Sequence, residues 1–139
     1  MRGSSGPSQA ICAVVLIAQL DGEIIAASAL ARLLGVSKSY LLKRLQSLSG
    51  AGILTAMPGT FGGYRLSKSA ETITVLDVLD AIEGKRRRPS LKRASQSGAG
   101  IVPNCVEGAL EKAECAHRIA LEQVSIRDLV KKAEAKTAT

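Results

Sequence analysis

The sequence predicts a mainly α-helical fold with one small β-hairpin, and three observations lead to this class. Apolar residues recur at spacings of three and four in several separate stretches, which is typical of helices. Glycines cluster between two short apolar runs in "GILTAMPGTFGGYRL", residues 52–66, and this is typical of a hairpin because glycine takes positive φ without a steric penalty. Aromatic residues make up only 2% of the 139 residues, so the core must consist of Ala, Leu, Ile and Val.

The first part of the chain predicts two helices joined through a short extended piece. The run "AICAVVLIAQL", residues 10–20, is apolar on nearly all sides and predicts a helix that is covered on both faces. Ile24 and Ile25 then predict the extended piece. Ser28 is placed to cap a second helix, and Gly35 is placed to end it.

A third helix precedes the glycine-rich hairpin directly. Ser37 is placed to cap it, and the helical period separates its inward leucines from its outward polar residues: Leu41, Leu45 and Leu48 against Ser39, Lys43 and Gln46. Helix, turn, helix and hairpin is the order of a winged helix-turn-helix, in which the second helix of the pair enters the DNA major groove. Glycines in the hairpin, or wing, allow its backbone to approach phosphates closely.

Two further helices are predicted toward the C-terminus. Thr74 is placed to cap one in "ITVLDVLDAIEG", and the basic, Ser- and Gly-rich residues 85–102 predict a mobile loop. Asn104 and Glu107 have the spacing of a capping box at the start of a long final helix. Its heptad-like positions predict a seam for a partner helix, either in a homodimer or on the first helix of the same chain: Val106, Leu110, Ala113, His117, Ala120 and Val124.

These elements predict two functional parts. Residues 1–70 form a winged helix-turn-helix DNA-binding domain, and residues 71–139 form a linker helix, the basic loop and a long C-terminal dimerisation helix. The formal net charge of +7 favours a polyanionic partner over a merely basic, solvated surface. Six basic side chains lie within residues 85–93, which leaves +1 for all other residues.

The composition excludes several classes of protein. The chain has one His, no paired-carboxylate motif and no phosphate-cradling GxxxxGK, so an enzyme is not expected. The apolar run at 10–20 is too short to span a bilayer, and Asp21 and Glu23 interrupt its likeness to a secretory signal, so no membrane contact is expected. Three cysteines at no zinc spacing favour a reducing, cytoplasmic location.

The chain resembles the Rrf2 family of bacterial transcription regulators. The resemblance lies in "MRGSSGPSQAICAV", "GVSKSYLLKRLQSLSGAGIL", "GGYRLSKSAETITVLDVLDAIEG" and "SIRDLV", which together cover most of the chain. It implies a homodimer with paired C-terminal helices, a roughly palindromic double-stranded DNA operator, and signal sensing near those helices. The chain departs from the family at Pro58, where members commonly carry an arginine that enters the minor groove, and at Gly6 and Ser8, which replace basic residues.

We expect a sequence-specific, dimeric DNA-binding regulator, and a repressor because a compact dimer on a promoter blocks polymerase. Its candidate DNA contacts lie at the helix pair and on the wing: Ser28, Ser37, Lys38, Ser39, Tyr40, Lys43, Arg44, Gly59, Thr60 and Arg65. The alternative is a winged-helix module that binds protein without specific DNA contact.

The cysteines Cys12, Cys105 and Cys115 are the candidate sensing residues. Family members that bind an iron–sulfur cluster use three cysteines in and just after the loop before the long helix, and only Cys105 matches that pattern. No cofactor is therefore expected, and the alternative is a cluster with atypical ligands that include Cys12 of a partner chain. Cys105 at the first turn of its helix would meet unpaired backbone N–H groups, which lower the pKa of a thiol, so Cys105 is expected either as a redox switch or as a small buried apolar residue. His117 is expected in the seam and Cys12 in the core.

Overall fold

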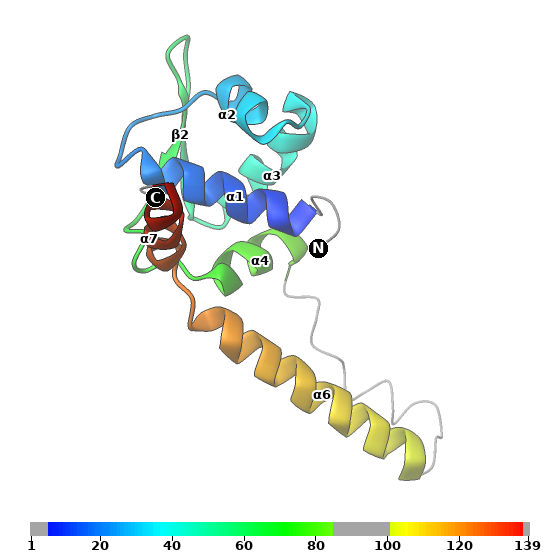
Figure 1. Ribbon diagram of the computed structural model, residues 1–139. Helices are drawn as coiled ribbons and strands as arrows, with labels where there is room; N and C mark the ends of the chain where they lie inside the picture. Colours follow the sequence, from blue (N-terminus) through cyan, green and yellow to red (C-terminus); the bar gives the residue numbers. More distant parts are fainter. Residues whose placement is uncertain (1–5, 85–100, 138–139) are drawn as a thin grey trace.

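The computed structural model describes residues 6–84 and 101–137, and it is mainly helical with one antiparallel hairpin (Figure 1). The mainly α class with a small β-hairpin is confirmed. The mobile loop predicted at 85–102 lies outside the described residues except for its last two. In chain order the elements are α1 (Gly6–Gln19), α2 (Ala27–Leu34), α3 (Lys38–Gly50), β1 (Leu54–Met57), β2 (Gly63–Leu66), α4 (Val75–Glu83), α6 (Ile101–Glu122) and α7 (Ile126–Thr137).

Helix α1 lies at the centre of the compact part of the molecule (Figure 1). Its Ala10, Ala13, Val14 and Ile17 are buried in the core, and the helices α2, α3, α4 and α7 all contact it. The prediction that this apolar helix is covered on both faces is confirmed. The inward leucines of α3 complete the core beside it, since Leu41, Leu45 and Leu48 are all 0% exposed.

Three of the predicted helix ends are confirmed and two are wrong. Ser37 caps α3, because its Oγ accepts a hydrogen bond from the Tyr40 amide at 3.3 Å. Gly35 ends α2 with a left-handed φ of 69°. Thr74 forms a full capping box with Asp77 at the start of α4.

The cap predicted at Ser28 is wrong, because α2 already begins at Ala27. Its N-cap position is taken by Ala26, which has no side chain able to accept a hydrogen bond. Ser28 therefore lies in the first turn, where its side chain is exposed.

The start predicted for the long helix is also wrong. Helix α6 begins at Ile101, a turn before Cys105, so Asn104 lies within the helix and does not cap it. Cys105 consequently lies beyond the first turn. Its amide is not among the unpaired N–H groups of the helix end, and the physical premise of the predicted redox switch fails.

The hairpin pairs β1 with β2 in a register that places Leu54 opposite Leu66 and Met57 opposite Gly63. Ile25 pairs with Tyr64 of β2 in a single-residue antiparallel bridge. The Ile25 amide donates to Tyr64 O at 3.0 Å, and the Tyr64 amide donates back to Ile25 O at 2.8 Å. The extended piece predicted at Ile25 is thus confirmed, and it ties the base of the wing to the segment between α1 and α2.

Helix α7 is an element that the sequence analysis did not separate from the long helix. Ser125 and Asp128 form a capping box at its start, with reciprocal hydrogen bonds of 3.1 and 3.0 Å. Ile126 and Val130 of α7 are buried in the core against α1. The "S-x-x-D" spacing was the available sequence signal for this second helix start.

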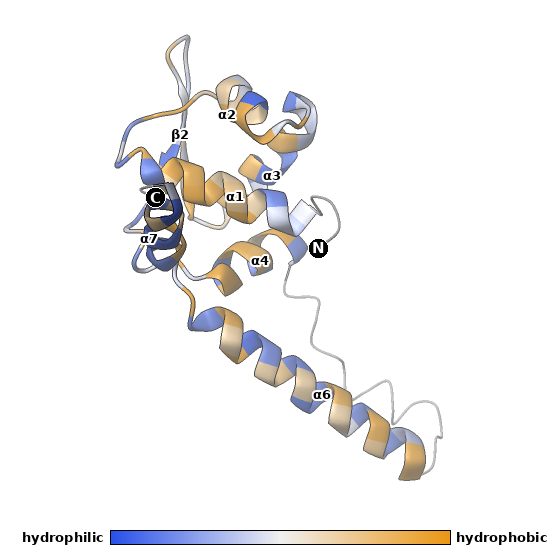
Figure 2. Ribbon diagram, viewed as in Figure 1, coloured by the Kyte–Doolittle hydropathy of each residue, from blue (hydrophilic) through white to orange (hydrophobic). Residues whose placement is uncertain are grey.

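Helix α6 projects away from the compact part, and none of its residues is buried (Figure 1). Orange segments along it in Figure 2 mark apolar residues, and five large ones are exposed: Ile101, Val102, Val106, Leu110 and Ile119. Within the described residues, no helix is long and apolar enough to cross a membrane.

The α7 capping box gives the stability of the fold a pH dependence. Hydrogen bonds from the Ser125 amide and hydroxyl lower the pKa of Asp128 below its ordinary value of 3.8. Because the ionised carboxylate is favoured in the folded state, its stabilising effect is present above pH 3.8 and is lost as pH falls through the lower, folded-state pKa. We expect Asp128→Asn to flatten the decrease in the free energy of unfolding on acidification, measured by urea denaturation. Glu134→Gln on the same helix is the control and should leave that dependence unchanged.

Candidate nucleic-acid interface

The segment that builds the helix pair and the wing carries no negatively charged side chain. Residues 24–70 contain no Asp or Glu, and they carry six basic side chains: Arg32, Lys38, Lys43, Arg44, Arg65 and Lys68. The net charge of the chain conceals this region, because acidic residues elsewhere offset these six basic side chains and leave residues 85–93 with nearly all of the excess. Counting the charged residues in successive segments of the chain reveals this basic region.

Helix α3 presents its polar side chains to solvent on the side opposite its buried leucines. Lys38, Ser39, Lys43 and Gln46 are all exposed, and Leu41, Leu45 and Leu48 are fully buried. This confirms the predicted division of α3 into an inward and an outward side. The outward side is rich in hydrogen-bond donors and carries a charge opposite to that of a polyanion.

Tyr40 and Arg44 lie differently from the other candidate contacts of α3. Both are half-buried, Arg44 Nη2 donates to Tyr40 Oη at 3.4 Å, and the guanidinium carbon lies 5.1 Å from the centre of the tyrosine ring. They pack against the start of α1, where a Cβ on Gly6 would lie 2.6 Å from Arg44 Nη2. Gly6, a departure from the family pattern, thus provides the space that these two side chains occupy.

The wing is a tightly built loop. The Gly62 amide donates to Gly59 O at 3.0 Å, and Gly59 has a φ of 105°, in the left-handed region that favours glycine. A Cβ on Gly62 would lie 2.0 Å from Met57 O, and one on Gly63 would lie 2.1 Å from Ile25 O. Contacts within the chain therefore require glycine here, in addition to the predicted need for approach to phosphates.

An open groove of about 660 Å³ lies between α2, α3 and the wing. It brings together four of the predicted contacts, namely Ser28, Lys38, Gly59 and Thr60. Leu42, Met57 and Tyr64 also line it, and the sequence analysis did not single them out. Arg65 does not line the groove; it is exposed on β2, opposite Thr55.

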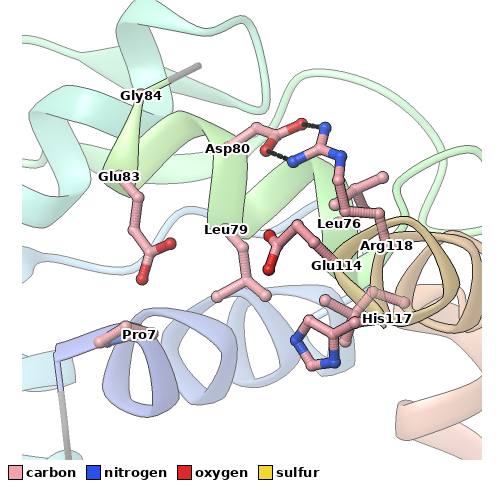
Figure 3. Close-up of a pocket in the computed structure, with 10 residues that line it drawn as sticks. Pro7, Leu76, Leu79, Asp80, Glu83, Gly84, Glu114, His117 and Arg118 are labelled. Carbon is pink, nitrogen blue, oxygen red and sulfur yellow. Dashed lines mark hydrogen bonds and ion pairs between the residues drawn. The ribbon is translucent and has the colours of Figure 1, made fainter. Parts of the chain in front are cut away.

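A second, smaller pocket of about 200 Å³ lies where α6 meets α4 and the start of α1 (Figure 3). Arg118 of α6 donates two hydrogen bonds to Asp80 of α4, both at 3.1 Å, and this pairing raises the pKa of Arg118. Glu114, His117 and Pro7 line the pocket around this ion pair. The pair joins α6 to α4.

The fold and these surfaces can be compared with known proteins. Residues 4–132 match the Rrf2 family, described as "Iron-dependent Transcriptional regulator". The chain belongs to the Rrf2 family. It is therefore a transcription regulator by family and not an enzyme, and the predicted winged helix-turn-helix fold is confirmed.

Relatives and solved structures agree with this assignment. The chain is 36% identical to YffB of Lactococcus lactis over 126 residues, which is 89% of this chain and 76% of that protein. It is 33% identical to YwgB of Bacillus subtilis over 109 residues, 78% of this chain and 65% of that one, and both names place these proteins among HTH-type transcriptional regulators. T. potens IscR shares the fold, with a TM-score of 0.75 at 22% identity over 98% of this chain and 90% of that one. B. subtilis CymR, titled the global cysteine regulator, has a TM-score of 0.69 at 18% identity over 95% and 98%.

Within a single chain, the residues do not bring together a ligand set for the iron centre that the family description names. The described residues contain no group of three His, Cys, Asp or Glu side chains that could hold a metal ion, and the remaining segments contain none of these residue types. Cys105 and Cys115 lie on one helix, separated by about 15 Å along its axis. The prediction that Cys12 lies in the core is wrong: Cys12 is exposed, because it lies on the side of α1 away from the buried residues. Cys105 and Cys115 on α6 are exposed as well.

The close approach of Gly63 to Ile25 predicts a strong effect of a single methyl group. We expect Gly63→Ala to break the two backbone hydrogen bonds between Ile25 and Tyr64. The change should lower the free energy of unfolding by about 2–3 kcal/mol, measured by urea denaturation. Gly50→Ala is the matched control, because a Cβ there meets nothing within 4 Å. The control should be neutral or stabilising by about 0.5 kcal/mol, and an equal effect of both changes would contradict the interpretation.

Proposed function

We propose that this Rrf2 protein is a homodimeric repressor that binds a double-stranded, roughly palindromic DNA operator, with α3 in the major groove. The observation that supports this most directly is the absence of Asp and Glu from residues 24–70, the segment that builds the helix pair and the wing. DNA attracts such a surface over its whole extent, whereas a protein-binding module has no general need to exclude acidic residues.

The proposed contacts divide into those that specify bases and those that position the duplex. Ser37, Lys38, Ser39 and Lys43 lie at and after the start of α3, the end of a recognition helix that meets base edges. Thr60 and Arg65 on the wing bind phosphates or the adjacent minor groove, with Gly59 shaping the turn. Tyr40 and Arg44 support this interface indirectly, because they contact each other on α3 and lie against Gly6 at the start of α1.

Ser28 belongs to the positioning contacts. The first turn of α2 has no side-chain cap and no acidic residue, so its backbone N–H groups are available to a phosphate. Ser28 lines the same groove as Lys38 and Thr60. A sugar–phosphate strand lying in this groove would meet all three.

The proposed dimer uses the solvent-facing side of α6. Val106, Leu110, Ala113, His117 and Ala120 of the predicted seam are exposed, and Val124 at the end of α6 is half-buried. The residues of α6 that face α4, among them Glu114 and Arg118, occupy a different side of the helix. Apart from His117, which also lines the pocket beside α4, the exposed seam residues are open to a second copy, and α7 rather than α6 occupies the face of α1 in the same chain.

The two functional parts, residues 1–70 and 71–139, divide labour in this proposal between DNA contact and dimer contact. They share one hydrophobic core, since Ile126 and Val130 from the second part are buried with α1 from the first.

The first test concerns the electrostatic contacts of α3. We expect Lys38→Ala and Lys43→Ala each to weaken binding to the duplex upstream of the protein's own gene, and to reduce the slope of log affinity against log salt by about 0.9 for each phosphate that the variant no longer neutralises. Fluorescence anisotropy at several salt concentrations measures both quantities. Lys112→Ala is the control, because Lys112 is exposed on α6, far from α3 (Figure 1). Wild-type binding that does not depend on salt would favour the protein-binding alternative.

The second test concerns the α6 seam. We expect Leu110→Arg to shift the protein from dimer to monomer in sedimentation equilibrium, because a buried charge without a partner opposes association. Leu110 is 58% exposed in the single chain, so the change should not affect folding of the monomer. Cys115→Arg is the control on the opposite side of the helix, and loss of the dimer in both variants would contradict the assigned seam.

A further inference from the structure

The tip of the wing carries an unusual side chain for a surface that faces a polyanion. Phe61 is the only phenylalanine of the chain, and it is 95% exposed, more than any other large apolar side chain of the described residues. Five of the remaining exposed large apolar residues lie on α6: Ile101, Val102, Val106, Leu110 and Ile119. Two of them, Val106 and Leu110, belong to the proposed dimer seam. The loop between β1 and β2, which carries Phe61, lies far from α6, so pairing of α6 helices would leave this side chain exposed (Figure 1).

Backbone contacts on both sides of Phe61 fix the loop that carries it. The turn bond from the Gly62 amide to Gly59 O closes the loop, and the Met57–Gly63 pair of the hairpin lies directly below it. Gly62 lies so close to Met57 O that no side chain fits there. A phenyl ring on this tight turn has only its own two side-chain torsions to restrict on binding, which keeps the entropy cost of burying it low.

The groove beside α3 indicates what the ring would meet. Thr60 and Gly62, the neighbours of Phe61, line the groove, but Phe61 itself does not. If α3 lies in the major groove and a sugar–phosphate strand lies in the protein groove, the wing tip extends past that strand toward the adjacent minor groove. The wing residues 54–66 contain Arg65 and no acidic side chain, so their charge favours this approach.

We propose that Phe61 inserts into the minor groove as an apolar wedge that partly unstacks one base step and bends the duplex. This inference rests on the proposed DNA binding and adds a contact that reads sequence without a hydrogen bond. Apolar side chains that enter the minor groove kink DNA in this way, and pyrimidine–purine steps such as TA and CA resist the deformation least. Phe61 therefore gives the protein a preference for a flexible step beside each half-site.

The test combines affinity with two measures of DNA shape. The duplex upstream of the protein's own gene carries a donor and an acceptor dye at its ends to measure bending. Versions of it carry 2-aminopurine at successive adenines, because unstacking raises the fluorescence of that base. For the wild-type protein we expect a bend and a rise in 2-aminopurine fluorescence at one step outside each α3 contact.

Three variants separate a wedge from an ordinary wing contact, and none should affect folding because Phe61 has almost no contacts in the chain. Phe61→Ala should abolish the bend and the fluorescence rise and weaken binding about tenfold. Phe61→Leu keeps an apolar wedge and should retain most of the bend. Phe61→Arg should bind with a steeper salt dependence but without unstacking. Lys43→Ala is the matched control, which should weaken binding while the bound duplex remains bent.

The outcomes distinguish this inference from the proposed function. Specific binding by the wild type with no bend and no fluorescence rise, or a bend that Phe61→Ala leaves intact, overturns the wedge and leaves the DNA-binding regulator in place. The ring would then meet a protein partner on the DNA. Absence of specific DNA binding by the wild type overturns the proposed function and the wedge with it.

Discussion

The structure depends on burying one helix that is apolar on nearly all sides. No single neighbouring layer can cover such a helix, so α1 needs contacts around most of its circumference. The helix pair α2 and α3 provides one part of this cover, and α4 and α7 provide another. The N-terminal and C-terminal parts of the chain are thus joined through α1. The leucines of α3 pack in the same core, which leaves the opposite side of α3 free to be polar.

A second constraint, the close approach of two backbones, places the wing. Ile25 and Tyr64 exchange two short hydrogen bonds, and this exchange is possible only because Gly63 has no Cβ to strike Ile25 O. The position of the wing relative to α2 and α3 is therefore a property of main-chain contacts. The exposed side chains of the wing, such as Thr60, Phe61 and Arg65, can serve DNA contact because the fold does not need them.

The elements that sequence could predict are those set by local chemistry. The caps at Ser37 and Thr74, the stop at Gly35 and the inward leucines of α3 all follow from spacings within one or two turns. The start of α6 was misplaced because Asn104 and Glu107 imitate a capping box inside the helix, and α7 was missed although Ser125 and Asp128 have the same kind of spacing.

The features that sequence could not predict depend on residues far apart in the chain. The orientation of Arg44 depends on the space left by Gly6, and the requirement for Gly63 depends on Ile25. The candidate contacts Lys38, Ser39 and Lys43 lie on the outward side as predicted, since that side follows from the period of α3 alone. Arg44 does not lie on that side. Its long side chain packs instead against Tyr40 and Gly6, so its position depends on its neighbours as well as on the helical period.

The position of α6 links the two proposed interfaces. It contacts the compact part mainly through α4, where the two hydrogen bonds between Arg118 and Asp80 resist rotation of one helix about the other. Helix α4 in turn packs on both α1 and α3. A change in how two α6 helices pair would therefore be transmitted through α4 to the spacing of the two α3 helices, and that spacing decides which half-sites a dimer can bind at once. In the proposed dimer, a signal that acts on the seam or on the pocket around Arg118 would reach the proposed DNA surface by this route.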